Sequence, residues 1–226
     1  MPQTLFLSVP PDFPVTVQPD TWLSDALVVL SVVLAMALLK RFLQLLPYLA
    51  DSFLRMRGSA VLESSVRVSQ DRDLVAMALV VPAIVVTYHY NLYNPRFLQG
   101  LDPTLRLCAV AAALVAYGFL RWLIYVWVRP GNHLDIFRQA HKGVRTYFIF
   151  FMLLVLTSLG VLALAGVESA IIRYVIYAQA ALVFLLTLQR CAQLLSLSCN
   201  RLRTFLYLCA LEILPAALLV VSAVVL

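Results

Sequence analysis

The chain has 226 residues, of which 63% are hydrophobic and only 12% are charged. The charged share is about half that of a soluble domain, and a mean hydropathy of +0.92 far exceeds that of a globular core with a wet surface. This composition excludes a water-soluble domain, a disordered chain, a disulfide scaffold and a collagen. It leaves an integral membrane protein.

The first twenty residues differ from the rest of the chain. They contain no Lys or Arg, and Pro10, Pro11 and Pro14 prevent a helix there. A signal peptide needs a basic start followed by an apolar core, so we expect no cleavable signal peptide. We predict an extended tail over residues 1–20 and a single transmembrane helical domain over residues 21–226.

Apolar runs follow one another along this domain. Each is close to the roughly 20 residues that a helix needs to cross a hydrocarbon core of about 30 Å. The runs are continuous and do not alternate, which favours helices over a β-barrel. We therefore predict an all-α bundle of about six transmembrane helices, in which Pro82 kinks the second span and Pro215 lies within the sixth. The predicted spans are residues 22–39, 74–92, 105–128, 147–165, 170–188 and 204–226.

Two stretches between the spans have the pattern of interfacial helices. Over residues 42–57 the polar side chains Gln44, Asp51 and Arg55 fall near one stripe at helical spacing, which predicts an amphipathic helix on the cytoplasmic leaflet, bent at Pro47. A similar segment is predicted over residues 133–145. Basic interfacial helices favour anionic lipids, so we expect the bilayer, and its anionic lipids at the cytoplasmic face, to be partners.

The basic residues are distributed unevenly between the two sides of the predicted bundle. The net charge is +6, and of the 17 Lys and Arg residues only Arg96, Arg106 and Arg173 lie outside the first, third and fifth connections. The positive-inside rule then puts those three connections in the cytoplasm and both termini in the periplasm of a bacterial inner membrane. The charge thus indicates orientation and not nucleic-acid binding.

Glu212 is the most informative polar residue, because a carboxylate about 12 Å inside a span costs about 3 kcal/mol to insert. It is either a proton or cation site, or a polar contact that fixes helix packing. Gln179, midway along the fifth span, is its natural partner, while Arg121 either pairs with Glu212 or extends to the headgroups. Pro215 frees a carbonyl near Leu211 that would join this network.

Polar and aromatic residues also gather at the outer end of the second span. Tyr88, His89, Tyr90 and Asn91 are either a small periplasmic binding surface or part of an interfacial aromatic belt, which Tyr commonly populates. Both interpretations place these side chains at the membrane surface.

The third connection contains His133, Asp135 and His141. The two histidines are about 12 Å apart along a helix, too far to share one ion. No phosphate loop, hydrolase or nucleotide motif is present, so we predict no metal, no cofactor and no catalytic residue. These residues are solvated interfacial side chains or, alternatively, the headgroup-level site of a lipid-acting enzyme.

The closing segment FLYLCALEILP over residues 205–215 resembles the C-terminal signature of the domain-of-unknown-function 4271 family, and KRFLQLL over residues 40–46 is similar to that family's pattern after its first span. The resemblance extends from about Ala26 to the end of the chain. It implies a small multi-span inner-membrane protein of Bacteroidetes-type bacteria. It places Glu212 and Pro215 within the signature and assigns no catalytic residue.

Three classes of function follow. The first, which we expect, is an assembly, scaffold or accessory subunit that contacts other membrane proteins or a second copy of itself. The second is a small-solute or proton-coupled transporter or channel that uses Glu212, although transport sites usually gather several polar residues around broken helices. The third is a lipid-acting membrane enzyme, which needs a cavity with convergent polar groups.

Overall fold

The computed structural model describes residues 22–54, 66–95, 98, 100–127, 134–196 and 201–225, so the tail predicted over residues 1–20 lies outside them. The regular elements in these ranges are all helices. In chain order they are α1 (Trp22–Leu54), α3 (Val66–Ala78), α4 (Val80–His89), α5 (Pro103–Trp127), α6 (Leu134–Leu164), α7 (Ser169–Ser196), α8 (Arg201–Leu208), the π-helix η2 (Cys209–Ile213) and α9 (Leu214–Val225).

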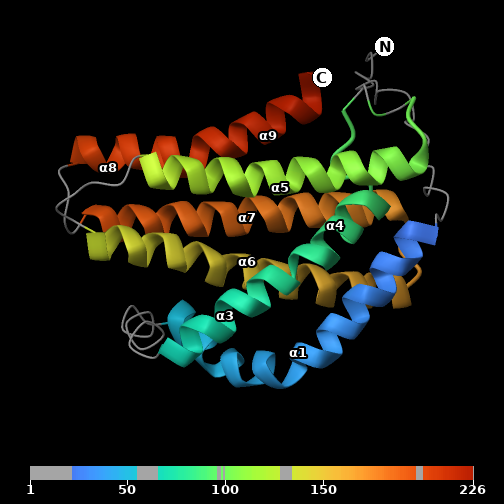
Figure 1. Cartoon of the computed structure of the whole chain (residues 1–226), viewed down its shortest axis with the longest axis horizontal. Coiled ribbons are helices and arrows are strands. Elements are labelled where there is room, and N and C mark those ends of the chain that lie inside the picture. Colours follow the sequence, from blue (N-terminus) through green and yellow to red (C-terminus); the bar gives the residue numbers. More distant parts are fainter. Residues whose placement is uncertain are drawn as a thin grey trace, which may run out of the picture.

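Six stretches of these helices are long and apolar enough to cross a membrane. They are Trp22–Pro47, Val68–His89, Pro103–Trp127, Gly143–Leu164, Ser169–Gln193 and Phe205–Ala223. The predicted all-α membrane bundle is therefore confirmed. In Figure 1 α5, α6 and α7 lie along the long axis, while α3 and α4 cross it obliquely and α1 curves beneath them. α6 packs on α7, α9 on α5, and α1 on α3 and α4.

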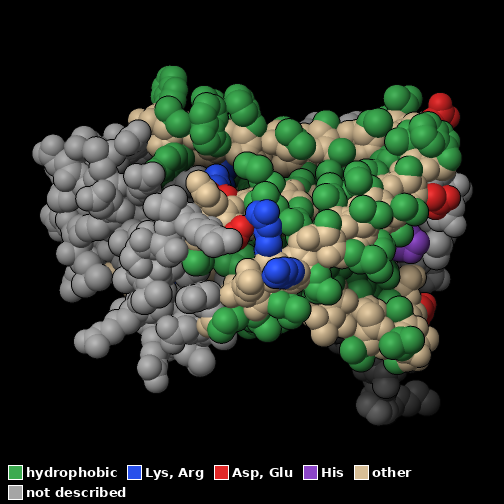
Figure 2. Space-filling model, turned by 60° about the horizontal axis from the view of Figure 1, so that its bottom comes forward, with side chains coloured by type: hydrophobic (Ala, Val, Ile, Leu, Met, Phe, Trp, Pro, Cys, Tyr) green, Lys and Arg blue, Asp and Glu red, His purple; other side chains and the backbone are tan. Residues whose placement is uncertain are grey.

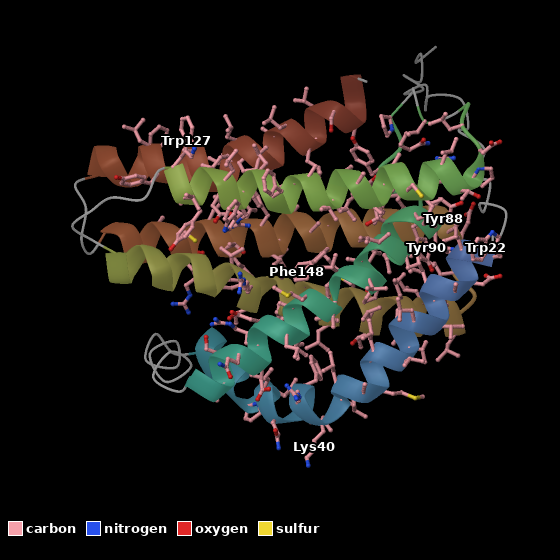
Figure 3. The ribbon with its side chains drawn as sticks, viewed as in Figure 1. Trp22, Lys40, Tyr88, Tyr90, Trp127 and Phe148 are labelled. Atoms are coloured by element: carbon pink, nitrogen blue, oxygen red, sulfur yellow. The ribbon has the colours of Figure 1, made fainter. Side chains whose placement is uncertain are left out.

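Exposed tryptophans mark the two ends of the bundle. Trp22 is 76% exposed and Trp127 is 85% exposed, and they lie towards opposite ends of the long axis (Figure 3). Tryptophan concentrates at both membrane–water interfaces because its ring is apolar and its N–H is polar. The apolar helix surfaces between the two residues are therefore the part that faces lipid.

Two helices are longer than predicted and include the segments that we expected to be separate. α1 continues from Trp22 to Leu54, where we predicted an end at Leu39 and a new helix from residue 42, and it changes direction near Lys40 (Figure 3). α6 likewise joins most of the segment 133–145 to the fourth span. Its 31 residues extend about 46 Å, more than the hydrocarbon core of about 30 Å, so the helix projects beyond the core.

The second span is interrupted where Pro82 predicts a kink. Pro82 has no N–H to donate to the Ala78 carbonyl, and its ring crowds that carbonyl. The structure ends α3 at Ala78 and begins α4 at Val80, with Leu79 between them. Helical hydrogen bonding resumes directly after Pro82, since the Ala83 N–H donates to the Leu79 carbonyl at 3.2 Å. The result is a kinked span.

Two clusters of buried side chains hold the helices together, one towards each end. The cluster of Leu45, Val75, Ala76 and Ile149 joins α1, α3 and α6, and that of Val86, Val155, Leu159, Ile172 and Ile176 joins α4, α6 and α7. A tight turn brings α6 and α7 together beside the second cluster. Gly166 adopts a φ of +64° there, and the Val167 N–H closes a Schellman motif on the Leu162 carbonyl at 3.1 Å.

Candidate functional site

Glu212 lies in a short π-helix whose position follows from Pro215. Pro215 cannot donate to the Leu211 carbonyl, so the regular hydrogen-bond ladder fails just after Glu212. The Leu214 N–H instead reaches back five residues to the Cys209 carbonyl, which makes η2 a wider turn. π-Helical turns frequently occur at functional sites. Here the turn presents the buried Glu212 side chain to α5, against which η2 packs.

The partner of Glu212 is Arg121 on α5, with which it forms an ion pair. The Arg121 side chain is 16% exposed and the Glu212 side chain is 7% exposed, so both charged groups are largely buried inside the bundle. The Cys191 Sγ on α7 lies 4.0 Å from Glu212 Oε1. Of the two alternatives that the sequence left for Arg121, the ion pair is the one the structure adopts.

The pairing of Gln179 with Glu212 is wrong. Gln179 Oε1 instead accepts a hydrogen bond from the Ser158 hydroxyl on α6 at 3.3 Å. The error has a physical origin, because α7 continues to Ser196 and not to the predicted end at residue 188. Glu212 therefore meets α7 near Cys191, about 18 Å along the helix from Gln179.

A pocket of about 150 Å³ lies beside the Arg121–Glu212 pair. Its wall is mostly aromatic and aliphatic, and its polar groups are the charged pair with Tyr117, Tyr147 and Thr187. Thr187 donates to its own helix, at 2.8 Å from the Val183 carbonyl, and Tyr147 interacts with Arg190. Arg121, Glu212, Thr187 and Tyr147 thus bond to other groups of the protein. Three phenylalanines form the apolar aromatic part of the wall: Phe148, Phe151 and Phe184.

The predicted outer cluster is only partly a surface. His89 is exposed and stacks edge-on against Tyr90, with 5.1 Å between the ring centroids. Tyr88 is 4% exposed, and its hydroxyl donates to the Pro103 carbonyl at 3.3 Å, so its assignment to a surface cluster is wrong. Tyr90 packs on the buried cluster of α4, α6 and α7, where burial raises the pKa of its hydroxyl.

Asn91 belongs to a polar clamp that the sequence analysis missed. Arg106 on α5 donates to Asn91 Oδ1 at 2.9 Å and to Asn94 Oδ1 at 2.7 Å. Asn91 adopts a φ of +51°, a conformation that Asn tolerates better than most residues. Nearby, the Tyr177 hydroxyl donates to the Leu92 carbonyl at 2.9 Å. These contacts fix the α4–α5 connection and are structural in character.

Ion pairs at the opposite end of the bundle form a second network that the sequence analysis missed. Arg72 is 1% exposed, and it donates to Asp73 at 3.1 Å and to the Ser69 hydroxyl at 3.2 Å. Asp73 also pairs with Arg145 on α6 at 2.6 Å, and Arg41 on α1 pairs with Asp71 at 2.9 Å. The network therefore connects α1, α3 and α6.

The side chains of His133, Asp135 and His141 lie outside the part of the chain that the structure describes. Their roles stay as the sequence predicts them. Among the side chains that are described, no group of three or more His, Cys, Asp or Glu residues is arranged to hold a metal ion.

A groove of about 450 Å³ runs between α5 and α9. Ala113 and Ala116 on α5 and Pro215 on α9 are among its small lining residues, with Phe119 and Leu218 as exposed apolar ones. The Tyr93 hydroxyl and Ser222 Oγ, 3.1 Å apart, bond to each other at the end of the groove towards the carboxyl end of α9. The groove is thus an apolar surface within the membrane-spanning region, next to the Arg121–Glu212 pair.

No protein-family model matches the chain, and no curated protein or solved structure is detectably similar to it.

Proposed function

We propose that the chain is an assembly or scaffold subunit of a membrane complex, and that the α5–α9 groove receives a transmembrane helix of another polypeptide. The observation that carries the proposal is a division between polar and apolar groups. Glu212, Gln179 and Arg106 bond to other residues of the bundle, whereas the groove between α5 and α9 is lined mostly by apolar side chains.

The side chains of the groove suit a helix as occupant. Lipid tails are as apolar as Leu, so helices associate in a membrane through close packing, which small residues permit. Ala113 and Ala116 are one helical turn apart on α5 and line the groove, while Phe119 provides a large apolar contact beside them. The Arg121–Glu212 pair fixes α5 to the carboxyl-terminal helix, which pre-organises the groove.

Photo-crosslinking in the native membrane tests this proposal. A benzophenone amino acid at Leu218, in the groove, is expected to give a stoichiometric adduct with one membrane protein, whereas the same probe at Leu185, on an exposed face of α7, gives lipid adducts. Filling the groove with Ala116→Phe should lower the protein adduct about 10-fold, and Ala178→Phe on exposed α7 should leave it unchanged. Lipid adducts alone at Leu218 would refute the proposal.

We further propose that the bundle lies in a bacterial inner membrane with both termini in the periplasm. The distribution of Lys and Arg supports this orientation, since the network of Arg41, Arg72 and Arg145 belongs to connections that the positive-inside rule assigns to the cytoplasm. A cysteine added after Leu226 in a background free of other cysteines should react with a membrane-impermeant maleimide in intact spheroplasts. Protection of that cysteine until the membrane is permeabilised would reverse the orientation.

Proton-coupled transport is a second candidate, favoured by one observation. The pocket of about 150 Å³ reaches both Arg121 and Glu212, and Glu212 lies in a π-helix. Transport would require Glu212 to exchange its arginine partner for a proton during the cycle. The candidate therefore predicts a proton flux into proteoliposomes that depends on the Glu212 carboxylate.

A further inference from the structure

We infer that the protein has a specific site for one anionic phospholipid between α1, the kinked α3–α4 span and α6. The site combines an apolar cavity for an acyl chain with a cationic surface for the headgroup. It lies on the α1 side of the bundle and is independent of the α5–α9 groove, so the inference goes beyond the proposed function.

The cavity has a volume of about 320 Å³, at the small end of the range for ligand pockets of roughly 300–1,000 Å³. Ser31, Leu38 and Phe42 of α1 line it together with Leu79 and Pro82 at the kink, and Leu153 and Leu156 of α6 close it. Both halves of the second span pack on α1, and the cavity lies where the two meet at Leu79 and Pro82. An unfilled apolar void loses dispersion contacts along its lining, which favours an occupant with apolar surface.

The length of the cavity matches one leaflet. Its α1 residues extend from Ser31 to Phe42, about 16 Å along the helix. Half of a hydrocarbon core is about 15 Å thick. A single acyl chain that begins beside Phe42 would therefore end near the middle of the bilayer.

Positively charged residues lie near the end of the cavity that Phe42 lines. Lys40 and Arg41 precede Phe42 directly, and Arg41 is half exposed although it pairs with Asp71. Lys40 is exposed, makes no ion pair with any described residue, and projects away from the bundle where α1 changes direction (Figure 3). Arg145 on α6 is a third partly exposed cation, whereas Arg72 is buried and adds charge without reaching the surface. The four cations face only Asp71 and Asp73, an excess of two positive charges.

The surface view agrees with this arrangement. Figure 2 shows Lys and Arg side chains grouped on one face, with acidic side chains beside them and a largely hydrophobic surface adjoining. Basic residues next to a cavity between transmembrane helices are the chemistry that retains anionic headgroups, and each Lys or Arg near the surface contributes about 1 kcal/mol. The occupant is therefore a phospholipid with a net negative headgroup and not a zwitterionic one.

Native mass spectrometry of the full chain tests the site. The protein is reconstituted in nanodiscs of equal parts phosphatidylglycerol and phosphatidylcholine and is then released into a mild detergent. We expect one phosphatidylglycerol to remain per chain, at least 5-fold over phosphatidylcholine. Lys40→Gln, a change at an exposed position, should reduce that preference about 5-fold, which is the factor that corresponds to about 1 kcal/mol.

A second pair of variants tests the cavity. Ala35→Phe fills it and should remove the retained lipid, whereas Val33→Phe on the exposed face of α1 should retain it. Equal retention of both lipids by the wild type, no retained lipid, or a second polypeptide in place of the lipid would overturn the inference. An unchanged preference in Lys40→Gln would also overturn it, and that variant keeps the test decisive if Ala35→Phe does not fold.

Discussion

We expect Glu212→Gln to destabilise the bundle by about 3 kcal/mol, because it leaves the Arg121 guanidinium buried without its carboxylate. The measurement is reversible unfolding in mixed micelles, followed by circular dichroism. Removing both charges in the double variant Arg121→Gln/Glu212→Gln should recover more than half of the loss, since a neutral amide pair carries no unpaired buried charge.

The matched control is Gln179→Leu, which removes a neutral contact at another level of the bundle. It breaks only the hydrogen bond from Ser158, and such bonds between transmembrane helices contribute about 0.6 kcal/mol on average. If Glu212→Gln costs no more than Gln179→Leu, the ion pair does not fix α5 to the carboxyl-terminal helix. A proton flux that Glu212→Gln abolishes in a folded protein would favour the transport candidate over the assembly subunit.

The fold class could be predicted because the membrane imposes it. Long apolar runs in lipid must close their backbone hydrogen bonds internally, and the structure has six such helical stretches. The extents of the helices were less predictable. α1 continues through Lys40 and Arg41, which look like the end of a span in the sequence, and Arg41 pairs there with Asp71 on the neighbouring helix. A sequence does not show that such a partner is within reach.

The sequence indicated which residues form the site around Glu212, but it did not decide which of them pairs with Glu212. Glu212 was identified because inserting a carboxylate into the membrane costs free energy. Pro215 indicated a local break in the helical hydrogen bonds, which the structure shows as the π-helix η2. The choice between Gln179 and Arg121 required the relative depth of two helices, which depended on the true end of α7. Cys191 was missed for the same reason, since it lay beyond the predicted end of the fifth span.

The network around Arg72 was missed although its signal was present. Three consecutive charges, Asp71, Arg72 and Asp73, directly precede the span predicted over residues 74–92. In the structure α3 begins before them, so the three side chains point in different directions around the helix. Arg72 is buried, while Asp71 and Asp73 reach α1 and α6. Charges at a helix start are commonly solvated. Arg72 is buried because α1 and α6 pack against α3.

This asymmetry predicts different effects for two otherwise similar substitutions. Asp73→Asn should destabilise the bundle by about 2–3 kcal/mol, because Asp73 is the carboxylate partner of the buried Arg72 and also bonds Arg145. Asp71→Asn removes the same charge two residues away, but its partner Arg41 is half exposed, so the loss should stay below about 1 kcal/mol. Unfolding of both variants in the same mixed micelles measures the difference.

A third variant separates the charge from the packing of this network. Arg72→Met keeps most of the buried volume and removes the guanidinium, and a buried charge replaced by an apolar side chain is often nearly neutral for stability. Combined with Asp73→Asn it should therefore cost less than Asp73→Asn alone, because no buried cation is left unpaired. Equal losses for Asp71→Asn and Asp73→Asn, or a double variant less stable than Asp73→Asn, would contradict the assignment of Asp73 as the counter-ion that allows Arg72 to be buried between α1, α3 and α6.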